Sequence, residues 1–422
     1  MPLPISPDTQ PPGGAVPPHV LPSGGPPDPG AGAAPGRPPG AGRIVSELPN
    51  GIMEVEVFRA DLPWDDLFLL ASRYNPRRGF IFVSKVLGKH WPVRPSAMAG
   101  IHDLLAARLA ALDLEPPVVL IAMAETAVGL GRGVFAGYAA LTGWRGALFL
   151  QTTRCNIGLP ALLTASEPHC HAPRHTVYVP QGDPEKLRIL RGARTLVLAD
   201  DEISTGETLL SLARAFAARA PGLRRAVFAS IASFLTGEAR RRVAASLPVP
   251  LSHVSALEGA FSFRKTADLA SPGPVVRSEG AGTPLAGAIP RERGRVGILA
   301  RDAGEAGFDT REALSALGLP AGCPARVIGT GEFLHEPYLL ARALEAEGRE
   351  VVFQSTTRTP IAPGGGVGSV LRFRDNYGEG LDNFLYNAPR DFPGATVVCR
   401  ETSASPVGFD VALSLGAREI LL

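Results

Sequence analysis

The chain has 422 residues, of which 45% are hydrophobic, and its formal net charge at pH 7 is +2. This length predicts two folded domains, and the hydrophobic fraction is large enough to build a core in each. The near-neutral charge gives no strong signal for binding to nucleic acid or to an anionic membrane. The 4 cysteines form no Cys-x-x-Cys pair, which disfavours a disulfide scaffold and a thiolate zinc site and favours a cytoplasmic location.

Two segments rich in proline and glycine mark the expected domain boundaries. Residues 1–43 can bury no core and lack the basic start and apolar stretch of a secretory signal, so they are predicted to be a disordered, dispensable tail. Residues 271–294 are predicted to link two folded domains at 44–270 and 295–422. No apolar run approaches the length of a membrane span, so no membrane partner is expected.

Strand and helix signals alternate along the first folded segment. Alternating polar and apolar residues predict a strand at 51–60, and continuous apolar runs predict buried strands farther along the chain. We expect further strands at 80–88, 116–124, 146–153, 194–200 and 224–235, with helices at 96–114, 129–143 and 208–220. This order predicts an α/β fold with a mostly parallel, doubly wound sheet.

Residues 118–154 and 325–358 share an order of elements. Each segment reads as a strand, a turn that contains a glutamate (Glu125 or Glu332), a helix, a second strand and then Thr-Thr-Arg. The shared order extends well beyond a chance match of three residues. It therefore predicts that the second domain is a duplicated, degenerate α/β unit.

The stretch "TLVLADDEISTGETLL" (195–210) carries the strongest functional signal. Asp200 and Asp201 end an apolar strand, where open parallel sheets bind ligands, and the polar loop after them opens a helix whose N–H groups suit a phosphate. Helix capping explains one such acid or hydroxyl, but not two adjacent acids followed by Ser-Thr-Gly-x-Thr. The pattern predicts a ribose 5-phosphate site, with sugar hydroxyls on the two carboxylates and phosphate on Ser204, Thr205, Gly206, Glu207 and Thr208.

This stretch resembles the signature with which type I phosphoribosyltransferases bind 5-phosphoribosyl 1-diphosphate (PRPP). The segments "EPHCHAPRHTVY", "FQSTTRTPI" and "DNYGEGLDNFLYN" resemble one orotate phosphoribosyltransferase-like branch, which carries a C-terminal TRSP domain and occurs in bacterial tellurite-resistance and stress gene clusters. The resemblance spans about 48–420. Three positions depart from the family pattern: Glu207 replaces a common Gly, Thr359 replaces Ser, and Cys170 replaces a hydroxyl residue.

The resemblance implies transfer of ribose 5-phosphate from PRPP to an unknown base-like acceptor, with release of pyrophosphate and synthesis of a nucleoside-like metabolite. It implies Mg²⁺ as cofactor, held at Asp200 and Asp201 directly or through water. A PRPP-sensing or RNA-binding regulator without catalysis is the alternative, and a scaffold in a multi-enzyme assembly is a third. A homodimer stays open as the assembly.

Two further segments are expected to serve the departing pyrophosphate. The loop after the strand at 116–124 supplies Glu125, Thr126 and Ala127, against the alternative of a plain strand–helix turn. A mobile hood over the substrate is expected to supply catalytic or pyrophosphate-binding groups, although a metal site or an ordinary polar loop would also account for its histidines. Its candidate residues are Arg154, Glu167, His169, His171 and His175.

The remaining candidates concern the acceptor and the second domain. Lys85 and Lys89 are expected on the acceptor side, with a solvated basic face as the alternative. The strand near 395 has Glu401 but no second acid and no phosphate loop, so the second domain is not expected to bind PRPP. It is expected to bind another ligand or to complete the first site, through Glu332, Thr356, Thr357, Arg358, Asp375, Asn376 and Tyr377.

Overall fold

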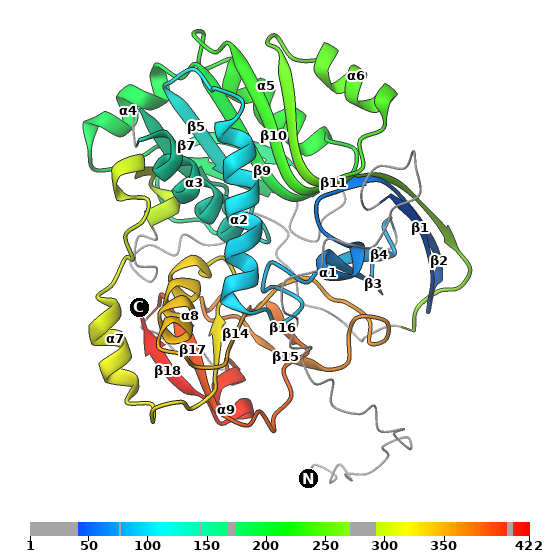
Figure 1. Ribbon diagram of the computed structural model, residues 1–422, viewed down its shortest axis with the longest axis vertical. Coiled ribbons are helices and arrows are strands. Elements are labelled where there is room, and N and C mark those ends of the chain that lie inside the picture. Colours follow the sequence, from blue (N-terminus) through cyan, green and yellow to red (C-terminus); the bar gives the residue numbers. More distant parts are fainter. Residues whose placement is uncertain (1–40, 76, 144–145, 167–173, 271–292, 403–407) are drawn as a thin grey trace, which may run out of the picture. The chain divides into compact units, whose positions relative to one another are not determined.

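The computed structural model describes residues 41–422, apart from 76, 144–145, 167–173, 271–292 and 403–407 (Figure 1). The expected tail therefore lies almost wholly outside the described residues, as does most of the expected linker. Among the described helices, none is both long enough and apolar enough to span a membrane.

An eight-stranded sheet forms the N-terminal region. Its order is β1-β2-β11-β10-β9-β5-β6-β12, and the five strands from β11 to β6 are parallel, which confirms the predicted fold class. The antiparallel strands β1 and β2 lie at one end of the sheet, and the antiparallel strand β12 lies at the other. The bounds are β1 (Gly42–Leu48), β2 (Gly51–Ala60), β5 (Val118–Ala122), β6 (Ala147–Gln151), β9 (Thr195–Ile203), β10 (Arg225–Ser233), β11 (Leu251–Lys265) and β12 (Ile298–Leu299).

Helices connect these strands and pack on the sheet. α2 and α3 pack on each other, and α3 also contacts β5, β6 and β9. Gly131 of α3 allows this close approach, because a Cβ there would lie 2.4 Å from the Cβ of Ala122 on β5. The helices are α1 (Trp64–Leu67), α2 (Pro95–Ala110), α3 (Val128–Thr142), α4 (Pro184–Arg191), α5 (Glu207–Ala217) and α6 (Gly237–Ala245).

Two hairpins lie outside the main sheet. The strand expected at 80–88 is the shorter β4 (Phe80–Ser84), which pairs with β3 (Phe68–Ser72) and not with the parallel strands. The second hairpin joins β7 (Ala161–Ser166) to β8 (Arg174–Tyr178). Thr176 of β8 forms an isolated bridge with Thr153, just after β6, and Arg73, just after β3, forms one with Ile361 of the C-terminal region.

The C-terminal region is a second α/β sheet with the strand order β14-β13-β17-β18, all parallel (Figure 1). A hairpin of β15 (Val370–Arg374) and β16 (Asp382–Tyr386) accompanies it. The other elements are β13 (Ala325–Gly329), β14 (Val351–Ser355), β17 (Ala395–Arg400), β18 (Arg418–Leu421), α7 (Thr310–Leu317), α8 (His335–Ala346) and α9 (Val411–Leu415). The 3-10 turns are η1 (Arg293–Arg295) and η2 (Ala300–Asp302).

The second sheet repeats the centre of the first. We therefore call the N-terminal region with the eight-stranded sheet the first copy and the C-terminal region the second copy. The order β14-β13-β17-β18 matches β6-β5-β9-β10, with the same parallel neighbours. In the first copy, the N–H of Ala124 donates to Oγ1 of Thr152 at 2.7 Å and the N–H of Thr152 donates to the carbonyl of Ala122 at 2.9 Å. In the second copy, Gly331 donates to Thr356 at 2.9 Å and Thr356 donates to Gly329 at 3.1 Å. Equal topology and equal local hydrogen bonding support a duplication.

An apolar interface joins the two copies. Phe353 of β14 is fully buried, and its backbone exchanges hydrogen bonds of 2.7 and 3.0 Å with Val93, which precedes α2. Its ring also packs over Gly88, where a Cβ would lie 2.5 Å away. Val93 and Met98 of the first copy share one buried apolar cluster with Phe353.

Replacing Phe353 by Ala should therefore loosen both copies. We expect Phe353→Ala to lower the free energy of unfolding by about 3–5 kcal/mol, because it leaves a cavity in the interface. Urea unfolding of the full chain measures this change. Leu413→Ala is the matched control, since Leu413 is 86% exposed and such substitutions usually change stability by less than about 0.5 kcal/mol. Equal effects of the two substitutions would contradict the interface role.

Candidate functional site

A cavity of about 110 Å³ lies at the carboxyl ends of the central strands. Parallel strands end at the same edge of a sheet, so loops distant in sequence meet there. Seven of the predicted residues line the cavity and come from β9, from the loops after β5 and β6, from β8 and from α5. They are Glu125, Thr126, Arg154, His175, Asp200, Asp201 and Thr208.

The two adjacent aspartates lie near the carboxyl end of β9. The strand is fully buried over Thr195–Ala199 and half-buried from Asp200 to Glu202, so its carboxylates reach the cavity while its start stays in the core. Within the pair, the N–H of Asp201 donates to Oδ1 of Asp200 at 3.0 Å.

The predicted phosphate loop leads directly into α5. Gly206 has φ of 73° and precedes the first helical residue, Glu207, so the sharp turn uses a left-handed conformation that glycine adopts without strain. Gly206 itself provides no side-chain cap, and the N–H of Glu207 donates to Oγ1 of Thr205 at 3.4 Å. Only Thr208 of the loop lines the cavity, while Ser204, Thr205, Gly206 and Glu207 form the turn beside it.

Glu125 is held in place by a buried cation. Its carboxylate lies 2.7 Å from Nζ of Lys89, and both side chains are almost fully buried. Burial alone would raise the pKa of Glu125, but the charges of Lys89 and Arg154 outweigh it and lower the pKa to about 2. Lys89 also donates to the carbonyl of Gly331 at 2.6 Å, so it ties the loop after β5 to the second copy.

The two lysines expected on the acceptor side do not line the cavity. Lys89 is buried behind it, and burial lowers its pKa. Lys85 donates instead to the backbone carbonyl of Asp65. We therefore assign Lys89 a structural contact with Glu125, and the geometry gives Lys85 no contact with the cavity.

The hood is described only in part. Glu167, His169 and His171 lie outside the described residues. His175 of β8 is 2% exposed, and its Nδ1 lies 3.1 Å from Oγ1 of Thr152. Within the described ranges, no cluster of three or more His, Cys, Asp or Glu residues is placed to hold a metal ion by itself.

The cavity is also lined by residues to which the sequence analysis gave no role there. Arg73 and Arg78 belong to the β3–β4 hairpin, Glu202 follows the two aspartates, and Thr359 comes from the second copy. Nη2 of Arg78 lies 2.7 Å from both carboxylate oxygens of Glu202, yet burial raises the pKa of Glu202. Only the adjacency of Glu202 to Asp201 was a local signal. The others reach the cavity through tertiary contacts.

His90 lines the cavity as well. Its side chain is 4% exposed, and Nε2 has no hydrogen-bond partner among the described residues. Burial, followed by the charge of Lys89, lowers the pKa of His90 to about 3, so the imidazole is neutral at pH 7. A neutral imidazole offers one donor and one acceptor to a ligand.

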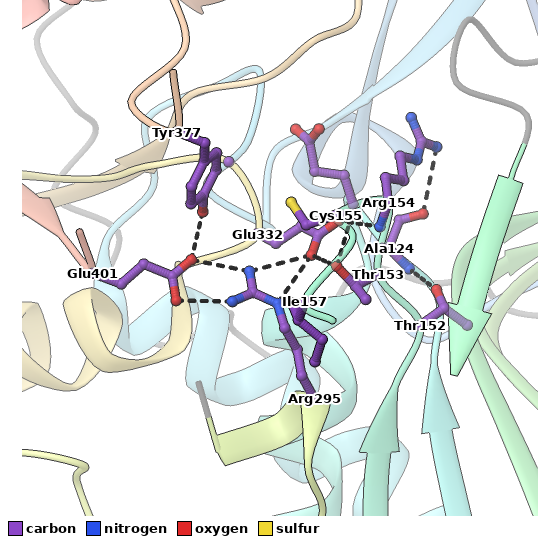
Figure 2. Close-up of polar contacts among 12 residues, drawn as sticks. Ala124, Thr152, Thr153, Arg154, Cys155, Ile157, Arg295, Glu332, Tyr377 and Glu401 are labelled. Atoms are coloured by element: carbon purple, nitrogen blue, oxygen red, sulfur yellow. Dashed lines mark hydrogen bonds and ion pairs between the residues drawn. The ribbon is translucent and has the colours of Figure 1, made fainter. Parts of the chain in front are cut away.

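In the second copy, protein side chains fill the corresponding position. By strand register Glu401, which follows β17, corresponds to Asp201 of β9, and Figure 2 shows its carboxylate bound by Arg295 and Tyr377. Arg295 is 1% exposed and reaches Glu332 as well, at 3.3 Å. Glu332 turns toward the first copy, where it accepts from Thr153 and, at 2.7 Å, from the N–H of Arg154 (Figure 2).

Most of the residues expected to form a second ligand surface are buried within the C-terminal region. Thr356, Thr357, Asp375 and Asn376 are at most 3% exposed. Asp375 accepts from the N–H groups of Tyr377, Glu379 and Leu381, and Arg358 pairs with Glu379 at 2.9 Å. We propose that Glu332 and Arg358 of this set join the two copies, since Glu332 accepts from Thr153 and Arg154 and Nη2 of Arg358 lies 3.9 Å from Sγ of Cys155.

Two family models match the chain along most of the described regions. Residues 67–260 match a phosphoribosyl transferase model, and residues 292–413 match the TRSP domain that follows this transferase at its C-terminus. The chain belongs to this phosphoribosyltransferase family. It is an enzyme of the glycosyltransferase type.

Solved structures similar to this phosphoribosyltransferase include adenine phosphoribosyltransferases. The Trypanosoma brucei enzyme, in complex with AMP, pyrophosphate and ribose 5-phosphate, is 16% identical over 45% of this chain and 76% of that one, with a TM-score of 0.32. The Giardia lamblia enzyme with 9-deazaadenine is 15% identical over 45% of this chain and 94% of that one, with a TM-score of 0.29. No curated protein matches the chain.

The Arg295 network should dominate the stability of the phosphoribosyltransferase. We expect Arg295→Met to lower the free energy of unfolding by about 3–5 kcal/mol, because it leaves Glu401 and Glu332 buried without their cation. Arg301→Met is the control, since Arg301 also contacts two carboxylates, Asp183 and Glu185, but is 52% exposed. Exposed pairs contribute about 0–1 kcal/mol. Urea unfolding separates the two outcomes, and equal losses would refute the account.

Buried histidines should make the phosphoribosyltransferase less stable in weak acid. Burial lowers the pKa of His90 and His102 to about 3, that of His253 to about 4 and that of His335 well below 6.5. Between those values and 6.5 the unfolded chain binds protons that the folded chain does not, so stability rises with pH. From pH 7 to pH 5 each histidine should cost about 2 kcal/mol.

Urea midpoints at pH 7 and pH 5 test this expectation. His102→Gln should reduce the dependence on pH by about a quarter, because one of the four histidines with a lowered pKa is removed. An unchanged midpoint between pH 7 and pH 5 would show that these imidazoles are charged or exposed in the folded protein.

Proposed function

We propose that this phosphoribosyltransferase uses PRPP and transfers its ribose 5-phosphate to a base-like nitrogen acceptor. The observation that carries the proposal is one cavity bounded by the adjacent carboxylates of β9, the loop after β5 and the start of α5. These three parts suit the three chemical groups of PRPP: sugar hydroxyls, pyrophosphate and 5-phosphate.

Each part has a proposed role. Asp200 and Asp201 accept hydrogen bonds from the ribose hydroxyls. The N–H groups at the start of α5, with the hydroxyls of Ser204, Thr205 and Thr208, bind the 5-phosphate, since a helix N-terminus attracts anions. The guanidinium of Arg154 and Thr126 bind pyrophosphate, while Glu125 keeps this loop in place through Lys89. Ala127 of the same loop is fully buried, and its N–H donates to the carbonyl of Met123.

Mg²⁺ fits this site as an ion bound by both the protein and the substrate. Since the described residues offer no complete protein cage, the ion would be held by the carboxylates of Asp200 and Asp201 together with substrate oxygens and water, as Mg²⁺ usually is. When bound, it offsets the negative charge that develops on the leaving pyrophosphate.

The transfer replaces one bond at C1 of the ribose. A nitrogen lone pair of the acceptor forms the new bond as the bond to the pyrophosphate oxygen breaks, and the acceptor nitrogen then loses its proton. Closure of the site keeps water from C1 in the meantime. We propose Glu167, His169 and His171 as hood residues on sequence grounds, together with His175, which lines the cavity.

The biological setting is proposed from the family branch that the sequence resembles. A cytoplasmic enzyme that makes a nucleoside-like metabolite in the response to tellurite or stress fits that branch. The polar lining of the cavity supports a small-molecule acceptor and gives no support to a membrane or nucleic-acid partner.

Replacing both aspartates should abolish PRPP binding without unfolding the protein. Each lost charge-assisted hydrogen bond costs about 1.5–3 kcal/mol, so Asp200→Asn/Asp201→Asn should weaken PRPP binding by about a hundredfold or more. Calorimetric titration with PRPP and Mg²⁺ measures the affinity, and pyrophosphate release measures turnover.

Asp65→Asn/Asp66→Asn is the matched control, because it neutralises another adjacent pair that is exposed on α1. The control should bind PRPP as the wild type does. Wild-type affinity in the Asp200/Asp201 variant would refute the site. PRPP binding with no turnover of any base would favour a sensor over an enzyme.

A further inference from the structure

The second copy reaches into the transferase cavity through one extended segment, residues 358–362. Thr359 lines the cavity. The N–H of Tyr74 donates to the carbonyl of Pro360 at 3.2 Å, and the N–H of Ala362 donates to the carbonyl of Ser72 at 2.9 Å. The segment thus continues the β3–β4 hairpin that also carries Arg73. The cavity wall is therefore built from both copies.

Two residues with neutral polar side chains, His90 and Thr359, line the cavity on this wall. The His90 imidazole is buried, and its Nε2 has no partner among the residues described. The Thr359 hydroxyl likewise forms no hydrogen bond within the described part of the chain, although its backbone is held. Buried or half-buried polar groups without partners cost free energy, and a ligand that supplies the partners removes that cost.

One tyrosine of the second copy fixes both groups. Tyr386 ends β16 and is fully buried. Its hydroxyl donates to the carbonyl of Thr359 at 2.7 Å and accepts from the N–H of Ile361 at 2.8 Å. Its ring packs at an angle against the imidazole of His90, with centroids 6.1 Å apart.

The next residue reinforces the arrangement. Nδ2 of Asn387 donates to the carbonyl of His90 at 3.0 Å and to that of Gly366 at 3.0 Å. The end of β16 therefore holds the first-copy side of the wall and the second-copy side at once. A packing contact alone would not need hydrogen bonds to both.

We propose that the C-terminal TRSP domain supplies the acceptor-selecting wall of the transferase site, with Thr359 and His90 contacting the acceptor and Tyr386 positioning both. This inference rests on the proposed function. The wall lines the same cavity as the carboxylates and the loop assigned to PRPP. Its neutral donors and acceptors read the hydrogen-bonding edge of the acceptor and keep water away from C1 when the acceptor is absent.

The first test needs no knowledge of the acceptor. Thr359→Gly and His90→Ala in the full chain should raise PRPP hydrolysis severalfold, measured as pyrophosphate release with no base added, because each opens the wall to water. PRPP affinity should stay unchanged. Thr310→Gly is the matched control, since Thr310 is a half-buried threonine on α7 that does not line the cavity.

The second test addresses the positioning residue. Tyr386→Phe keeps the ring on His90 but removes the hydroxyl that holds Thr359, so it should raise hydrolysis while leaving PRPP affinity unchanged. Tyr338→Phe is its control, because Tyr338 is also a buried tyrosine of the second copy, bound to Arg342 at 3.3 Å and absent from the cavity lining. Melting temperatures of both variants separate positioning from a general loss of stability.

Selectivity is tested with adenine, hypoxanthine, uracil and nicotinate as probes. Among the probes that the wild type converts, Thr359→Val should change relative kcat/KM by about tenfold, the effect of about 1.4 kcal/mol. Wall variants that match their controls in hydrolysis and in probe use, with normal PRPP binding, would overturn this inference alone. Failure of the wild type to bind PRPP would overturn the proposed function, and this inference with it.

Discussion

The buried ammonium group of Lys89 connects the two copies next to the candidate site. Lys89 is 1% exposed, so its charge must be compensated inside the fold. It finds Glu125 at 2.7 Å in the first copy, and the carbonyl of Gly331 at 2.6 Å and Oγ of Ser355 at 3.4 Å in the second. Because Glu125 starts the loop assigned to pyrophosphate, the second copy takes part in shaping that loop.

The duplication is therefore asymmetric in chemistry although it is symmetric in topology. In the first copy the carboxylates after the central strand line an open cavity. In the second copy the carboxylate of Glu401 is closed off by Arg295 and Tyr377. One copy keeps the space for a ligand, and the other uses the same space to bury an ion pair and to present Glu332 to its partner. The repeated fold thus provides one candidate site in the first copy, and the second copy holds residues of the first in place.

Local sequence patterns predicted the parts of the site that local structure creates. Asp200, Asp201 and Glu125 follow apolar strands, and the polar loop before α5 contains the glycine that its left-handed turn requires. The repeat was visible because its two copies keep the same order of strand, helix, strand and Thr-Thr-Arg.

The pairing of His90 with Thr359 in the proposed acceptor wall could not be found in this way. His90 lies in an irregular segment after β4, and Thr359 follows β14 in the other copy, so only tertiary pairing brings them together. Lys89 was expected on the acceptor side because the family resemblance implies that its segment helps to cover the acceptor. The structure buries it instead, since its three donors find Glu125 and two oxygens of the second copy. The seven polar residues of the C-terminal region were noticed as a group, but sequence alone did not distinguish a ligand surface from a polar interface.

The most direct measurement of this account is the number of PRPP molecules bound per chain, determined by calorimetric titration of the full-length protein with PRPP in the presence of Mg²⁺. An open first copy and a filled second copy predict one molecule per chain. Two molecules per chain would show that the second copy kept its site, and none would remove the PRPP site from the first copy as well.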